Sequence, residues 1–223
     1  MDYGFMAEYA LMYVKAAELT IKISAYGIIG AFAVGLICCL IKELKIPVLY
    51  RIVQMYIELS RNTPLIIQLF FLYFGFPKMG IVLSSRSCGI IGLIFLGGSY
   101  MAEAFRTGID SVPNVQRESA YSLGMTKRQT FLRIIIPQAV ATSVPVFCAN
   151  VIFLIKETSV FSAVALADLM YVTKDLIGLY YKTDEALLML VISYLIILLP
   201  ISFISSWIER RVRYAGFGNT GSV

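Results

Sequence analysis

The feature that most constrains this chain is a series of apolar stretches, each near the length needed to cross a membrane. Five of them occupy 19–41, 48–74, 88–105, 138–155 and 186–207 of the 223 residues. A transmembrane helix needs about 20 mostly apolar residues. With 59% hydrophobic and 15% charged residues, the chain has too little polar surface for a water-soluble globule. It is therefore predicted to be an all-α membrane protein of about five transmembrane helices, forming one domain over 1–223.

The N-terminal segment 1–18 does not resemble a cleavable signal peptide, because it carries Asp2 and Glu8 where a signal peptide has a basic region. Its apolar residues include Phe5, Tyr9 and Tyr13. Their spacing predicts a helix that lies in the membrane interface rather than one that crosses it.

Basic residues predict the orientation of the chain in a bacterial cell membrane. They gather in the loops after the first, third and fifth stretches, for example at Lys42, Arg117 and Arg210. Loops rich in lysine and arginine stay in the cytoplasm, so the N-terminus is expected outside and the C-terminus in the cytoplasm. The net charge of +5 follows this topology and is spread over several loops, so no nucleic-acid partner is expected.

The chain has no histidine, which removes most zinc sites and serine–histidine triads from consideration. The four cysteines lie in or beside apolar stretches without metal-binding spacing, so they are interpreted as buried apolar residues and no metal site is predicted. A Ser159–Lys156 pair leaves a membrane enzyme open as an alternative.

Charged residues inside the apolar stretches need a partner or a cavity, because a lone charge at membrane depth costs about 3 kcal/mol. Glu58 can pair with Arg61, and Glu103 with Arg106, since each pair is three residues apart on a helix. Two interpretations remain open: structural ion pairs near the cytoplasmic boundary, or a polar cavity for a charged or zwitterionic solute. The candidate substrate-binding residues are Asn62, Thr63, Gln68, Ser99, Glu103, Asn150, Glu157, Thr158 and Ser159.

Three of the predicted spans contain proline, at Pro64, Pro145 and Pro200. Proline removes a helix hydrogen bond and frees a carbonyl four residues earlier, which in lipid must find another donor. The prolines are therefore interpreted either as ordinary kinks or, for Pro64 and Pro145, as marking helices that line a wet path.

The polar segment 112–133 separates the third and fourth spans. It predicts a helical hairpin: a first helix capped by Asn114, a stop at Gly124, and a second helix from Thr126 that Pro137 breaks or bends. Its surface suits either a position in the membrane interface or docking of a cytoplasmic partner.

Three motifs resemble a known transport family. The pattern Glu118-Ser119-Ala120, three residues, Gly124, nine residues, Ile134, one residue, Ile136-Pro137 is similar to the Glu-Ala-Ala loop of membrane subunits of bacterial ATP-binding-cassette importers. Ser119 stands where that family has alanine, and Ile136 where it has leucine. The segments RNTPLIIQLFFLYFG (61–75) and SYMAEAFR (99–106) resemble the polar amino-acid permease subgroup.

This resemblance implies a type I importer permease fold and a non-catalytic subunit that forms the translocation path. The implied partners are a second permease subunit, two ATPase subunits, an extracytoplasmic binding protein, a polar amino acid and membrane lipid. ATP and magnesium would be bound by the separate ATPase, and this chain would hold no cofactor. The implied ATPase-coupling residues are Glu118, Ser119, Ala120, Ser122, Leu123, Gly124, Met125 and Arg128.

Two questions stay open at this point. A membrane anchor or sensor that recruits an ATPase without passing solute is an alternative function. The identity of the amino acid, and whether two copies of this chain pair with each other, cannot be inferred from one sequence.

Overall fold

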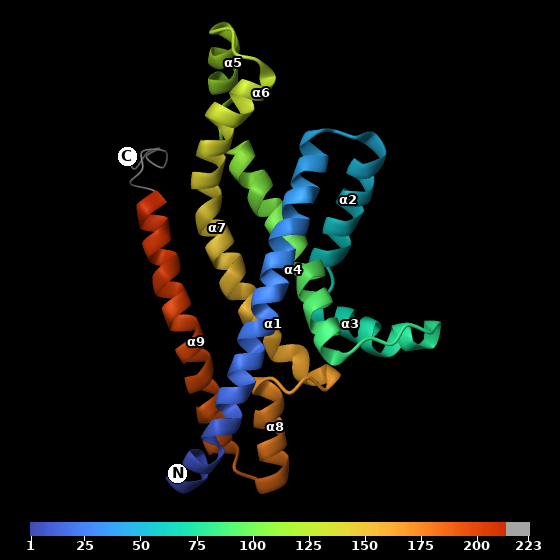
Figure 1. Ribbon diagram of the computed structural model, residues 1–223, viewed down its shortest axis with the longest axis vertical. Helices are drawn as coiled ribbons and strands as arrows, with labels where there is room; N and C mark the ends of the chain where they lie inside the picture. Colours follow the sequence, from blue (N-terminus) through green and yellow to red (C-terminus); the bar gives the residue numbers. More distant parts are fainter. Residues whose placement is uncertain (213–223) are drawn as a thin grey trace.

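The computed structural model describes residues 1–212, which fold into a long bundle of helices (Figure 1). Four helical segments in this range are long and apolar enough to cross a membrane. The elements in chain order are α1 (Tyr3–Glu43), α2 (Pro47–Arg61), α3 (Leu65–Phe70), η1 (Phe71–Gly75), η2 (Phe76–Met79), α4 (Ser85–Asp110), α5 (Asn114–Ser122), α6 (Lys127–Thr130), η3 (Phe131–Ile135), α7 (Ile136–Glu157), η4 (Thr158–Val164), α8 (Leu169–Tyr180) and α9 (Thr183–Val212).

Helix α1 corrects the prediction of a separate interfacial helix over 1–18. It runs without a break through 1–18 and 19–41, because no proline interrupts the sequence before Pro47. Phe5 and Tyr13 pack with residues of α8 and α9, and the Tyr13 hydroxyl donates to the Ala186 carbonyl at 2.8 Å. The apolar face of this segment is thus covered by protein.

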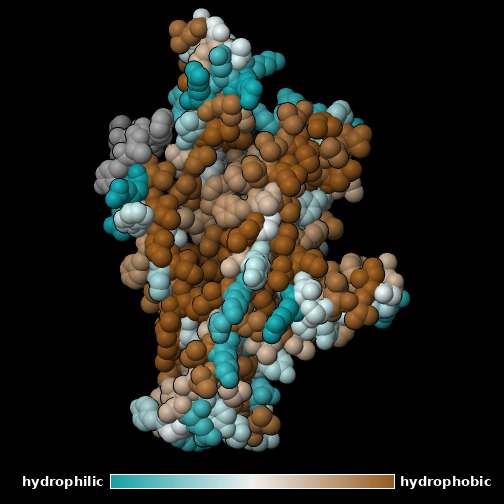
Figure 2. Space-filling model, in the orientation of Figure 1, coloured by the Kyte–Doolittle hydropathy of each residue, from teal (hydrophilic) through white to brown (hydrophobic). Residues whose placement is uncertain are grey.

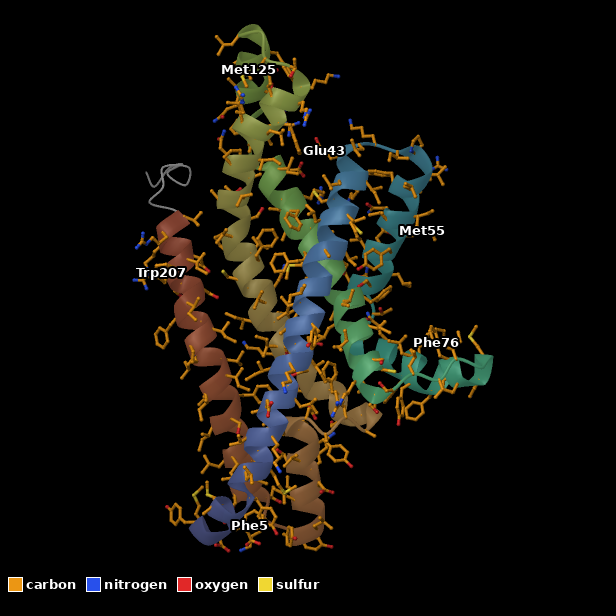
Figure 3. The ribbon with its side chains drawn as sticks, viewed as in Figure 1. Phe5, Glu43, Met55, Phe76, Met125 and Trp207 are labelled. Atoms are coloured by element: carbon orange, nitrogen blue, oxygen red, sulfur yellow. The ribbon has the colours of Figure 1, made fainter. Side chains whose placement is uncertain are left out.

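The second predicted span, 48–74, is not one helix. Helix α2 ends at Arg61, and α3 begins only after Pro64, which lacks an amide hydrogen and holds an extended ψ of 143°. Beyond α3 the chain continues as a π-helical turn and a 3-10 turn, forming an arm that points away from the bundle in Figure 1. The Phe76 label in Figure 3 marks this arm.

Helix α4 lies at the centre of the bundle and packs most extensively on α1 and α7. Its glycines allow close approach: a Cβ added at Gly97 would come within 2.7 Å of the Ala31 Cβ on α1. Small residues at helix contacts are typical of membrane bundles. The predicted third span, 88–105, lies wholly within this helix.

Helices α7 and α9 contain the predicted fourth and fifth spans, and both run through their internal prolines, Pro145 and Pro200. Between them lies α8, which the sequence analysis did not anticipate. Asp168 caps α8 by accepting from the Tyr171 amide at 2.9 Å. Its side chain is fully buried, and this burial raises the pKa of Asp168 to about 6 because it disfavours the charged form.

The surface agrees with a membrane location. Figure 2 shows hydrophobic side chains over most of the length of the bundle, with hydrophilic residues gathered at the α5–α6 end and at the opposite end, near the N-terminus. An apolar band between two polar ends is the pattern expected of a protein that crosses a bilayer.

Candidate functional site

The predicted helical hairpin is present and extends beyond the rest of the bundle (Figure 1). Helix α5 ends at Ser122, and Gly124 has a φ of +77°, the left-handed conformation that lets the chain reverse. Thr126 then caps α6 in a reciprocal capping box with Gln129. The predictions of a stop at Gly124 and a second helix starting near Thr126 are confirmed.

Two details of this hairpin differ from the prediction. Asn114 is the first residue of α5 rather than its cap, and the cap position is held by Pro113, which makes no side-chain hydrogen bond. Of the two predicted effects of Pro137, a break is wrong, because the chain stays helical from α6 through a π-helical turn at Phe131–Ile135 into α7. Proline cannot bond the carbonyl four residues earlier, and the π-helical turn directly before it is the local irregularity that accompanies this.

The predicted coupling residues lie together at the exposed end of the hairpin, where Figure 3 labels Met125. Ala120 is buried and holds α5 to the next turn through its carbonyl, which accepts from the Met125 amide at 3.0 Å. Leu123 is 82% exposed. Glu118, Ser119, Ser122, Gly124 and Arg128 are also exposed. Val115 and Tyr121 of the same hairpin are exposed hydrophobic residues as well. Several exposed apolar side chains on one protruding hairpin are a feature of a protein-docking surface.

The predicted substrate residues do not form one cluster. Part of them line a cavity of about 630 Å³ between α1, α2 and α4, which we call the hairpin-side cavity. At its wall, the Glu103 carboxylate contacts three cations: Arg106 at 2.9 Å, Lys42 at 3.5 Å and Arg61 at 3.7 Å. Arg106 also pairs with Asp110 at 3.2 Å. This group of five side chains carries one net positive charge.

The predicted pairing of Glu58 with Arg61 is wrong, whereas that of Glu103 with Arg106 is confirmed. The Glu58 carboxylate accepts from the Gln54 amide at 2.7 Å. Arg61 instead turns toward α4, where it meets Glu103 and lies 5.2 Å from the Tyr100 ring. On α4, Arg61 gains both an ion pair with Glu103 and a cation–π contact with Tyr100, and the second of these is not offered by Glu58.

A second cavity of about 500 Å³, which we call the central cavity, lies between α3, α4 and the α7–η4 junction. It contains Glu157 together with Asn62 and Thr63 from the break between α2 and α3. Arg61, Asn62 and Tyr100 line both cavities. These three residues therefore form the boundary between the two polar spaces.

The other candidate residues have structural partners. Gln68 donates to the Ser60 carbonyl, the acceptor freed by Pro64, at 3.1 Å. Ser99 is buried between α2 and α4, Thr158 is buried and donates to the Ile155 carbonyl at 2.7 Å, and Asn150 donates to the Tyr100 carbonyl at 3.3 Å. Ser159 is half-buried in η4 and lines neither cavity.

Several residues that line the two cavities were absent from the predicted substrate set, among them Lys42, Arg61 and Tyr100. Arg61 was recognised as an intramembrane charge but was assigned to Glu58. Lys42 was counted only as a loop cation. For Lys42 and Arg61, the signal in the sequence is charge: an acidic residue inside an apolar stretch, Glu103, needs cationic partners from other helices as well as from its own.

Comparison with known proteins places this geometry in a family. Residues 31–214 match the family described as "Binding-protein-dependent transport system inner membrane component". The chain belongs to this family of transport-system membrane components. It is a permease subunit that crosses the membrane several times, and the family's role in transport is that of a non-catalytic membrane component.

Individual relatives cover nearly the whole chain. The probable amino-acid permease protein YxeN of Bacillus subtilis is 32% identical over 95% of this chain and 96% of its own length. The glutamine transport system permease protein GlnP of Escherichia coli is 27% identical over 90% of this chain and 92% of its own.

Solved structures agree with the fold. The crystal structure of an amino acid ABC transporter with histidines has a TM-score of 0.90 and 29% identity, covering 95% of this chain and 99% of that one. An inward-facing MetNI methionine ABC transporter has a TM-score of 0.76 at 20% identity, with the same coverage of both chains. The second likeness bears on the fold alone. The expected all-α importer permease fold is confirmed.

Proposed function

We propose that this permease subunit carries a polar amino acid through the membrane, by way of the central and hairpin-side cavities. The observation that carries the proposal is the shared boundary of Arg61, Asn62 and Tyr100 between the two cavities. A solute that moves directly from one space to the other therefore contacts these three side chains. The printed functions of the relatives, amino-acid and glutamine permeases, support the substrate class.

The broken helix at Asn62–Pro64 suits this role. Irregular backbone at membrane depth is tolerated where it lines a polar cavity, and broken helices supply binding groups in transporters. Here the break contributes Asn62 and Thr63 to the central cavity. Its freed carbonyl is already satisfied by Gln68, so the break does not need the solute to remain stable.

The charges of the central cavity match those of an amino acid. Arg61 offers a guanidinium that binds a carboxylate through paired hydrogen bonds, and Glu157 offers a carboxylate for an ammonium group. Arg61 is available because its contact with Glu103, at 3.7 Å, is the longest of the three that Glu103 makes. We therefore assign the substrate carboxylate to Arg61 and its ammonium to Glu157.

The proposed assembly contains a second permease subunit, two ATPase subunits that bind ATP and magnesium, and an extracytoplasmic binding protein. The hairpin of α5 and α6 is the proposed ATPase contact, because it is rigid, protrudes from the bundle and exposes Leu123. This places the hairpin in the cytoplasm and the N-terminus outside, in agreement with the distribution of basic residues in the loops.

A pair of glycine substitutions tests the coupling role of the hairpin. Gly124 (φ +77°) and Gly80 (φ +84°) share the left-handed conformation, and a Cβ at either has nothing within 4 Å. Gly124→Leu and Gly80→Leu therefore impose the same backbone strain, about 1–2 kcal/mol, one in the hairpin and one at the end of η2 on the side arm. In proteoliposomes that hold the assembled importer, Gly124→Leu is expected to abolish ATP-driven uptake of labelled amino acid, and Gly80→Leu to retain it.

The same preparation separates this proposal from the alternative of a membrane anchor that recruits an ATPase. The anchor predicts ATPase binding without accumulation of any labelled amino acid by the unaltered protein. Equal uptake by the Gly124→Leu and Gly80→Leu proteins would remove the hairpin from the mechanism.

A further inference from the structure

A groove at the N-terminal end of the bundle carries charges that the transport path does not use. Its volume is about 420 Å³, and it lies between α1, the first turn of α4 and the start of α8. Lys15, Lys22 and Arg86 line it together with one carboxylate, Glu18. None of these residues lines the hairpin-side or central cavity.

The groove has unbalanced positive charge. Lys22 pairs with Glu18 at 2.5 Å, four residues away on α1. Lys15 and Arg86 make no ion pair or side-chain hydrogen bond within the described residues 1–212. Both are exposed. The groove therefore presents two unpaired cations to whatever occupies it.

The depth of these charges points to the membrane boundary. Lys22 is the last charged residue before the apolar stretch of α1, which continues without charge to Ile41. Arg86 stands in the first turn of α4, and the apolar part of that helix begins at Cys88. Cations from two helices thus meet at the same edge of the hydrocarbon, where the phosphates of a lipid leaflet lie.

The walls of the groove and the surface beyond it are apolar. The rest of the lining is Met12, Ala16, Leu19, Ala167 and Val172. Further along α1, Ile21, Tyr26 and Ile29 are exposed. Figure 2 shows the resulting pattern, a hydrophilic stripe on the N-terminal half of α1 that crosses a hydrophobic surface. A ligand that suits this site has an anionic head and an apolar tail.

We propose that this groove binds the phosphate of an anionic phospholipid, with Lys15 and Arg86 as its ligands and the acyl chains along α1. A cation that merely extends to the interface would need no groove and no second helix. Here, cations of α1 and α4 converge on one apolar-walled space, so a phosphate held between them can keep its acyl chains against the apolar surface of α1. The proposal depends on the membrane position of the chain and not on its cargo.

The test uses the purified subunit, or the assembled importer, in nanodiscs that contain phosphatidylcholine alone or with phosphatidylglycerol. Native mass spectrometry after transfer to detergent counts the lipids that stay bound. We expect the unaltered protein to retain phosphatidylglycerol in preference to phosphatidylcholine. The double variant Lys15→Gln/Arg86→Gln is expected to retain it about thirtyfold less well, because two basic contacts are lost.

The control is Lys78→Gln/Arg51→Gln, which removes one lysine and one arginine at exposed positions outside the groove. It should retain phosphatidylglycerol as the unaltered protein does, and circular dichroism should show equal helix content in both variants. Equal retention by the two double variants would overturn the proposal. Displacement of the lipid by millimolar inorganic phosphate would also overturn it, because that result indicates a site for free anions. Loss of binding-protein docking with unchanged lipid retention would overturn it as well, because that result indicates a protein-docking surface.

Discussion

Two regions of the molecule differ in whether their apolar side chains are buried or exposed. One is the contact between α1 and α4, and the other is the α5–α6 hairpin. Between α1 and α4, atoms of α4 occupy the space beside the glycines of α1. Gly27 faces Leu93, and Gly35 faces Met101 and the Ala102 backbone. In the hairpin, Ala120 is the buried residue of α5, and Leu123 is almost fully exposed. The first region is determined by contacts within this chain. The second has a rigidly capped backbone that leaves Leu123 exposed, as expected of a surface that contacts another subunit.

This difference predicts where substitutions affect stability and where they affect transport. The most sensitive position is Gly35, where an added Cβ would lie 2.5 Å from the Met101 Cβ and 2.8 Å from the Ala102 amide nitrogen. Gly35→Ala is expected to lower the free energy of unfolding by about 3 kcal/mol through overpacking. Thermal unfolding of the purified subunit in detergent measures this effect.

The matched control is Gly178→Ala on α8, where an added Cβ meets nothing within 4 Å. Because alanine favours helix over glycine by about 0.5–1 kcal/mol, this variant should be slightly stabilised. If both variants shifted the unfolding temperature alike, close packing of α1 on α4 would not be what holds the bundle together.

The ion pairs around Glu103 combine contacts within this chain with a position at the wall of the hairpin-side cavity, and Glu58 provides a comparison for them. The Glu103 carboxylate contacts three cations, whereas the Glu58 carboxylate accepts only from Gln54 among the described residues. Glu103→Gln is expected to destabilise the protein by about 2 kcal/mol, since charge-assisted bonds to Arg106 and Lys42 are weakened and excess positive charge remains. It should also slow uptake, because Arg61 loses its partner beside the cavity boundary.

Glu58→Gln keeps the hydrogen bond from Gln54 and is expected to change the unfolding temperature little. Uptake assays and thermal unfolding on the two glutamine variants give the comparison. Similar behaviour of both would show that the cluster around Glu103 is a solvated surface group without a structural role.

The smallest expected effect lies within the hairpin. Thr126→Ala removes the side-chain acceptor of the Gln129 amide in the capping box, at a cost of about 1 kcal/mol. Hydrogen exchange of amides at 127–130 should quicken while exchange in α4 stays unchanged. Thr107→Ala, an exposed position of α4 without a side-chain hydrogen bond in the described region, is the control. A global increase in exchange in Thr126→Ala would show that the hairpin is coupled to the bundle's stability.

The sequence was sufficient to predict the features that follow from local chemistry. Apolar length predicted the spans in α1, α4, α7 and α9, and residue type and spacing predicted the chain reversal at Gly124 and the start of a second helix near Thr126. These features depend on residues close together in the chain, so the sequence displays them directly.

The features that depend on distant contacts could not be predicted in this way. The continuity of α1 through 1–18 requires α8 and α9 to cover its apolar face. Arg61 pairs with Glu103, which lies 42 positions away in sequence on α4, and not with the nearby Glu58. Charge alone does not distinguish these two partners. The same holds for Thr158, whose burial followed from tertiary packing and not from its polar character.

The length of α1 has a mechanical consequence. At about 1.5 Å per residue, its 41 residues extend about 60 Å, roughly twice the thickness of the hydrocarbon. A stiff rod of that size amplifies rotation: a tilt of about 5° about one end carries the other end about 5 Å sideways. A tilt of that size at the end where Phe5 packs with α8 and α9 would therefore displace Lys42 by more than its 3.5 Å distance to Glu103. Movements at the two faces of the bilayer are thus coupled through one continuous helix.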